Sequence, residues 1–139
     1  MAKQKPQVVI TGRNGRFQMN KAQAIYKFWT NFDLPVFDEN SVPTGQALPY
    51  ITYNTVEDSI DYPVSLHGSL WYRTDSWTEI EKKANEISKY IGLSGQSIPI
   101  DTGYAWITRG TPFAQRMNDP NDSIRRIYIN LMAEFLSAD

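Results

Sequence analysis

The segment 76–92 carries the pattern that constrains the fold most. Its apolar residues recur at spacings of 3, 4, 3 and 4, namely Trp77, Ile80, Ala84, Ile87 and Ile91. This spacing predicts an α-helix with one apolar stripe. Ser76 followed by Glu79 predicts a capping box at its start, and Gly92 predicts its end. A helix with a single apolar stripe has to bury that stripe against another layer of structure.

Two segments with alternating side chains can supply that layer. Residues 64–73 and 124–135 place apolar and polar side chains in turn, which predicts half-buried β-strands, although the second segment also fits a helical face. Gly68 interrupts the first segment and is expected to mark a bulge. A first helix is expected over 20–32, with Asn20 as its N-cap and Gln23 completing a capping box. Shorter strands are expected at 50–54, 98–100 and 104–108. This order favours an α+β fold, with an antiparallel sheet and two main helices packed on one face.

Composition limits the class of protein. The chain has 139 residues, which predicts a single domain over 1–139, and it has no cysteine for disulfides or thiolate metal sites. The net charge is −1, but residues 1–32 hold six basic groups and no acidic one. Residues 33–72 hold six acidic groups and neither lysine nor arginine. This segregation is typical of a solvated surface or of faces that meet complementary partners. Residues 1–15 are expected to form a flexible arm.

Three short motifs suggest chemistry but have simpler explanations. Asp101-Thr102-Gly103 resembles the aspartic protease triplet, yet the same residues favour a tight hairpin turn. Residues 12–15, Gly-Arg-Asn-Gly, have the form of a KH loop but lack the preceding helix. His67 is the only histidine and has no second titrating partner in the sequence pattern. We therefore predict no catalytic residue, no metal site and no cofactor, and the protein is not expected to be an enzyme.

Residues 107–122, ITRGTPFAQRMNDPND, separate two strand-like runs. Glycine, proline, asparagine and aspartate favour a loop, and this one exceeds the usual hairpin length of about two to five residues. Arginine, aromatic residues and methionine are enriched at protein interfaces. We therefore predict an oligomer or partner interface made by Arg109, Thr111, Pro112, Phe113, Gln115, Arg116 and Met117. Two alternatives remain: Phe113 packs on its own core, or the arginines bind phosphate.

Residues 48–136 resemble the tail terminators of long-tailed bacteriophages, a group also described as minor capsid or minor tail proteins. The resemblance rests on LPYITY, VSLHGSLWYRTDSWTEIEKKANEIS, DTGYAWITRGTPFAQRMND and IRRIYINLMAEFL. The most distinctive parts are the strand-to-helix junction with Trp71, Ser76 and Trp77, and the stretch Arg-Gly-Thr-Pro-Phe-Ala-Gln at 109–115. Residues 1–47 contribute little to it.

The resemblance implies a structural virion protein that forms a ring, typically a homohexamer, at the head-proximal end of the tail. Its partners would be other copies of itself, the tail tube protein and a neck or head-completion protein. DNA would pass through without specific binding, and the protein would be made in the host cytoplasm. We expect the channel to be acidic or neutral, with Glu57, Asp58 and Asp61 as candidate lining. The alternatives are a small nucleic-acid-binding module that uses the basic N-terminus, or a head-completion protein of the same virion.

Overall fold

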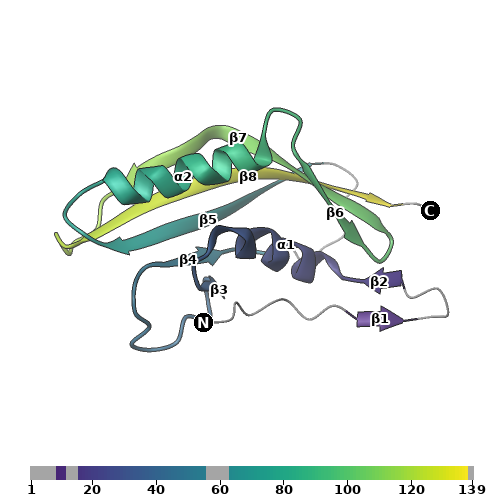
Figure 1. Cartoon of the computed structure of the whole chain (residues 1–139), viewed down its shortest axis with the longest axis horizontal. Helices are drawn as coiled ribbons and strands as arrows, with labels where there is room; N and C mark the ends of the chain where they lie inside the picture. Colours follow the sequence, from purple (N-terminus) through teal and green to yellow (C-terminus); the bar gives the residue numbers. More distant parts are fainter. Residues whose placement is uncertain (1–8, 12–15, 56–62, 138–139) are drawn as a thin grey trace.

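The computed structural model describes residues 9–11, 16–55 and 63–137, and it has the expected α+β architecture (Figure 1). Two α-helices and one short 3-10 helix accompany the strands. The helical elements are α1 (Lys21–Trp29), η1 (Thr30–Phe32) and α2 (Thr78–Ile91). The strands are β1 (Val9–Thr11), β2 (Arg16–Gln18), β3 (Val36–Asp38), β4 (Tyr50–Tyr53), β5 (Val64–Arg73), β6 (Gln96–Ile100), β7 (Gly103–Met117) and β8 (Ile124–Ser137).

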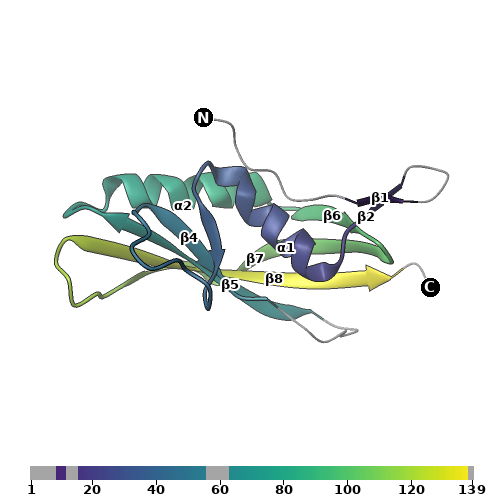
Figure 2. The same cartoon turned by 90° about the horizontal axis from the view of Figure 1, so that it is seen from below.

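Six strands form one sheet in the order β3-β4-β5-β8-β7-β6. Every neighbouring pair is antiparallel except β3 and β4, which are parallel. The long β8 lies at the centre, because it pairs with β5 along Val64–Arg73 and with β7 on its other side (Figure 2). Strands β1 and β2 form a separate antiparallel hairpin.

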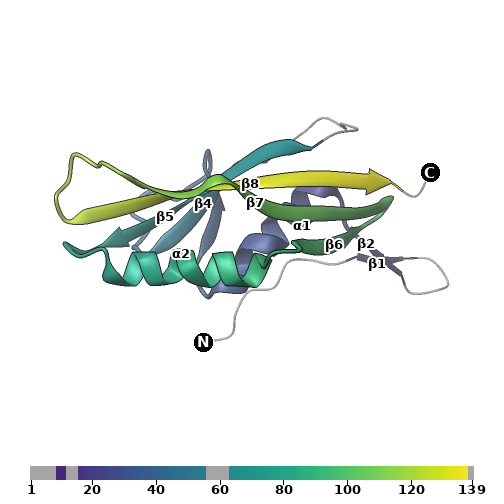
Figure 3. The ribbon, with the colours of Figure 1, turned by 90° about the horizontal axis from the view of Figure 1, so that it is seen from above.

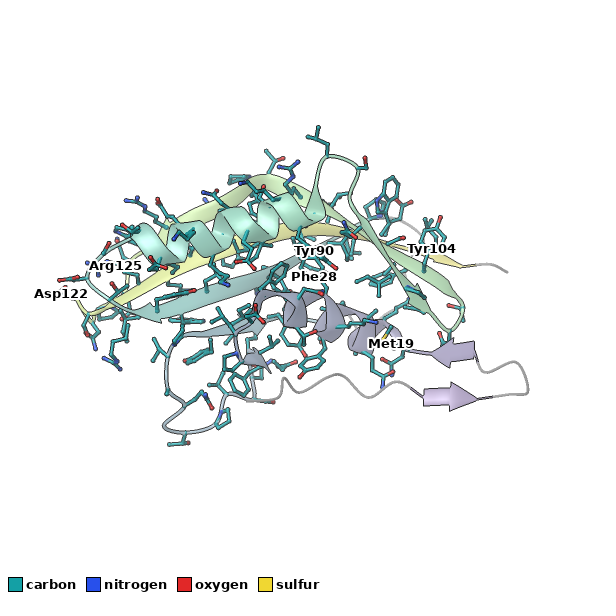
Figure 4. The ribbon with its side chains drawn as sticks, in the orientation of Figure 1. Met19, Phe28, Tyr90, Tyr104, Asp122 and Arg125 are labelled. Carbon is teal, nitrogen blue, oxygen red and sulfur yellow. The ribbon has the colours of Figure 1, made fainter. Side chains whose placement is uncertain are left out.

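Both helices cover the same face of the sheet and enclose the core (Figure 1). The apolar stripe of α2 is buried as expected, and the alternating residues of β8 turn their apolar side toward it. Phe28 of α1 lies with its ring centroid 6.0 Å from that of Tyr90 of α2, so the two helices also contact each other (Figure 4). The buried residues of β8 are Ile127, Ile129, Leu131, Ala133 and Phe135.

The two helices begin differently. In α1 the expected capping box is present, because the Asn20 and Gln23 side chains each accept from the other residue's backbone N–H. The capping box expected at Ser76 and Glu79 is wrong. The N-cap position of α2 is Trp77, and the Ser76 hydroxyl accepts from the Thr78 N–H at 3.1 Å instead.

Gly68 does not form a bulge, and that expectation is wrong. It pairs regularly with Tyr53 on one side and with Ile129 on the other. A Cβ atom at this position would lie 2.6 Å from two ring carbons of Trp29, which is fully buried. Glycine is needed here because the indole of α1 packs directly on the sheet backbone.

The loop expected at Arg109–Met117 is also wrong, because β7 continues through Met117 and only residues 118–123 turn the chain (Figure 3). The pairing with β8 shifts between Arg109 and Ala114. Between these two residues β7 advances by five positions while its partner β8 advances by two, from Leu131 to Ile129. Three extra residues of β7 therefore form a bulge. This bulge absorbs the glycine and the proline that suggested a loop.

Two contacts hold the bulge in place. A Cβ at position 110 would lie 2.8–2.9 Å from atoms of Asn130, so only Gly110 allows the two strands to approach this closely. The Asn130 side-chain amide then donates to the Pro112 carbonyl at 2.9 Å. The bulge is therefore a built feature of the sheet.

Some expectations fall on residues outside the described part of the chain. The candidate channel residues Glu57, Asp58 and Asp61 are among them, as are residues 12–15 with the Gly-Arg-Asn-Gly motif. Within the expected flexible arm at 1–15, only Val9–Thr11 are described, and they form β1.

Candidate functional site

Both arginines of the predicted interface bind the protein's own helix α2. The Arg109 guanidinium donates to the Ser88 hydroxyl at 2.9 Å. The Arg116 guanidinium donates to the Glu81 carboxylate, with nitrogen–oxygen distances of 2.5 and 2.6 Å. The two arginines lie on the helix side of the sheet because they pair with Leu131 and Ile127, which are buried there.

The other residues of that predicted interface divide into two groups. Phe113 is partly buried against the core of its own chain, as the alternative proposed. Met117 is half-buried, whereas the side chains of Thr111, Pro112 and Gln115 are exposed along β7. A contact with a partner therefore has to use these exposed residues and the strand backbone rather than an inserted Phe113.

A cation–π cluster closes the end of the sheet near the β7–β8 turn. The guanidinium of Arg116 lies 4.6 Å from the ring centroid of Trp77, and that of Arg125 lies 5.4 Å from it. Arg125 also donates to the carbonyl oxygens of Asp122 and Asp75, which fixes the turn (Figure 4). Trp77, a core residue in the sequence interpretation, is therefore half-buried beneath two cations.

The sheet face opposite the helices, called the outer face below, is covered by no helix or strand of the described residues. Its side chains come from positions that alternate with the buried ones on β5, β7 and β8. They include Ser65, His67, Ser69, Trp71, Tyr104, Trp106, Thr108, Arg126, Tyr128, Asn130, Met132 and Glu134. A sheet face with this many aromatic side chains is typical of a contact surface.

Aromatic rings line the β4–β5 side of the outer face. The ring centroid of Trp71 lies 6.3 Å from that of Tyr50, which lies 5.8 Å from that of Phe37. The Trp71 indole N–H donates to the Thr52 hydroxyl at 2.9 Å, so the ring is held in place. The Arg126 guanidinium lies 4.7 Å from the centroid of the Trp71 ring.

His67 belongs to the same surface. Its ring stacks on Tyr128 at 5.0 Å between centroids, and its Nε2 lies 3.1 Å from a Glu39 carboxylate oxygen. This geometry attaches the residues after β3 to the sheet. Within the described residues no group of three or more histidine and carboxylate side chains could hold a metal ion.

The other end of the outer face holds the most exposed aromatic residues. Trp106 and Tyr104 are 40% and 45% exposed, although the Trp106 indole N–H donates to the Ser94 carbonyl at 2.8 Å. A shallow cavity of about 300 Å³ lies beside them, lined by Pro63, Trp106, Thr108, Met132, Ala133 and Glu134. This end is therefore apolar and open.

The Asp101-Thr102-Gly103 triplet forms the expected turn, because Ile100 pairs with Gly103 across it. The backbone N–H of Asp101 donates to the Met19 carbonyl at 2.8 Å, so the turn packs on the segment before α1. Within the described residues no second carboxylate is hydrogen-bonded to Asp101.

Among the described residues, some strand edges have no strand neighbour. Strand β3 lies at one end of the sheet, and β6 at the other end pairs with Gly103–Ile107 of β7. Beyond Ile107, β7 therefore pairs only with β8 in the part of the chain that the structure describes. Exposed backbone at such an edge can pair with another chain.

Sequence reasoning missed the outer face. Trp71 and Tyr128 stand at positions that alternate with the apolar ones in their strands, and aromatic residues at such positions are the signal in the sequence for this face. Comparisons with family models, with curated proteins and with solved structures find no match to this chain. No helix in the described part of the chain is long and apolar enough to cross a membrane.

Proposed function

We propose that this chain is a structural subunit of a ring at the head-proximal end of a long phage tail. The ring ends polymerisation of the tail tube and offers a surface to the neck or head-completion protein. In this role the chain is a virion component that makes protein contacts and catalyses no reaction. The support for the phage assignment is the resemblance of its sequence motifs within residues 48–136 to those of tail terminators.

One observation carries the assembly part of this proposal. A whole sheet face with two tryptophans and several tyrosines is covered by no helix or strand of the described residues. Burying exposed aromatic side chains of this kind against a protein partner removes them from water and favours association. Trp106 is the residue best placed for such a contact, because it is 40% exposed beside the apolar cavity.

The test is a tube-assembly experiment. Tail tube protein polymerises alone or with this chain, and electron microscopy measures tube lengths. The chain should shorten the tubes and appear at one end of each. Trp106→Ala should weaken this effect, whereas Lys89→Ala, an exposed change on α2, should not. Tubes of unchanged length with no bound density would contradict the proposal.

A second candidate function has one observation in its favour. Aromatic rings and Arg126 on an open antiparallel sheet face resemble the stacking surfaces that bind single-stranded nucleic acid. Against it, the Arg126 guanidinium lies over the Trp71 ring and the His67 ring stacks on Tyr128. One face of each of these aromatic rings is therefore already in contact with a side chain of the same chain. Binding of a labelled single strand that weakens steeply with salt and is lost in Trp71→Ala would favour this candidate.

A further inference from the structure

We infer that neighbouring copies of this chain join edge to edge, with β3 of one copy paired to the segment 114–116 of β7 in the next. This inference rests on the proposed function, because it supplies the contact that would build the ring. It replaces the loop contact suggested by the sequence with a continuous sheet.

The edge residues of β3 and the residues 114–116 of β7 are in register with each other across the sheet. Following the pairing across the sheet, Phe37 aligns with Thr52, Ser69, Tyr128 and finally Gln115. By the same route, Val36 on one edge corresponds to Arg116 on the other, and Asp38 corresponds to Ala114. A second copy placed beside the first can therefore extend the sheet without sliding along the strand direction.

The directions of the strands also match. Strand β3 is parallel to β4, and three antiparallel pairings lead from β4 through β5 and β8 to β7. Strands β3 and β7 therefore run in opposite directions, so the new pair would be antiparallel. Phe37 and Gln115 both belong to the outer face, which keeps the helices of successive copies on one side of the extended sheet.

The chemistry of the β7 edge favours pairing. Ala114, Gln115 and Arg116 are all exposed, and none is a proline, so each keeps its backbone donor for pairing. The edge of β6 is a poorer choice, because Pro99 removes a backbone donor in its middle.

The proposed pairing joins two different surfaces of the chain. Contacts of this kind produce either a closed ring or an open helical filament. Repeated pairing closes into a ring when the rotation from one copy to the next divides a full turn.

The experiment uses disulfide trapping in the full chain, which has no cysteine of its own. Residues opposite each other on antiparallel strands have Cα atoms about 4.5–5.5 Å apart, a separation that a disulfide can span. The variant carries Phe37→Cys and Gln115→Cys together. A second variant with Asp38→Cys and Ala114→Cys guards against misfolding of the first, because Phe37 contacts Tyr50.

Under oxidising conditions, each double variant should give a ladder of covalent oligomers on a non-reducing gel, ending in one closed species. Each single variant should give dimers at most, because one cysteine can join only two chains. The control pairs Phe37→Cys with Ser97→Cys, an exposed residue on β6, and should give no ladder.

The outcomes separate this inference from the proposed function. Oligomers of the unmodified chain without cross-linking of either double variant would overturn the edge pairing and leave the ring function standing. A ladder in the control instead would move the contact to β6 and also overturn it. A complete ladder from a chain that never limits tube length would support the pairing while contradicting the tail function.

Discussion

At the scale of single residues, the indole of Trp29 fills the space where a side chain at Gly68 of β5 would lie. The ring cannot move away easily, because Trp29 is fully buried and packs edge-on against Phe28 with ring centroids 5.0 Å apart. Gly68→Ala should lower the free energy of unfolding by about 1–3 kcal/mol, as overpacking of a tight core usually does. Ser65→Ala, an exposed change on the same strand, is the matched control. Urea unfolding measures both, and equal stability of the two variants would show that the indole can shift.

Tyr53 should make the stability of the fold sensitive to alkaline pH. Burial raises the pKa of its hydroxyl from 10.0 to about 12, and the nearby Asp38 carboxylate adds to the effect. The pKa is therefore higher in the folded than in the unfolded chain. The contribution of the neutral Tyr53 side chain to the free energy of unfolding is complete below pH 10 and is lost as the pH rises toward 12. Tyr53→Phe should show a smaller loss of unfolding free energy between these pH values. An identical decline in both proteins would contradict this explanation.

At the scale of elements, the side chain of Phe113 packs the bulge of β7 against the core. The ring is partly buried against the core, so Phe113→Ala should lower the free energy of unfolding by about 1–3 kcal/mol, less than for a fully buried ring. Gln115→Ala, exposed on the same strand, should cost little. Chemical unfolding monitored by circular dichroism measures both. A fully stable Phe113→Ala variant that no longer self-associates would contradict this and would place Phe113 in the interface predicted from the sequence.

Periodicity predicted most elements well. The alternation at 64–73 matched β5 at both ends, and the apolar stripe of α2 is buried at Ile80, Ala84, Ile87 and Ile91. The first part of β7 agrees with the strand predicted at 104–108, but Arg109–Met117 was predicted as a loop because Gly110 and Pro112 normally end strands. A sequence cannot show that Asn130 of another strand holds them in a bulge. Strand β3 was missed because three residues are too few to show a period.

The candidate site was less predictable than the fold. Arg109 and Arg116 looked available to a partner, but their partners Ser88 and Glu81 lie on a helix that precedes them in the chain by more than 20 residues. Likewise, the shared register of β3 and the free part of β7 depends on four strand pairings in series. Such relations arise only when the sheet order is known.

At the scale of the whole molecule, the chain has a one-sided architecture. Both helices and nearly all buried apolar residues lie on one side of the sheet. Within the described residues, no helix or strand covers the outer face or pairs with the free edges of β3 and of Ala114–Arg116 in β7. An enclosed domain would cover such a face or protect such edges, since both promote association. The arrangement is therefore suited to a subunit whose fold is completed by its neighbours.

The mass of the purified chain in solution tests this conclusion most directly. The subunit has a mass of 16.0 kDa, so the hexamer implied by tail terminators would have six times 16.0 kDa, or about 96 kDa. Sedimentation equilibrium, alone and with tail tube protein, should find a single closed oligomer whose mass stays constant as the concentration rises. A chain that remains at 16.0 kDa under both conditions would contradict the proposed ring.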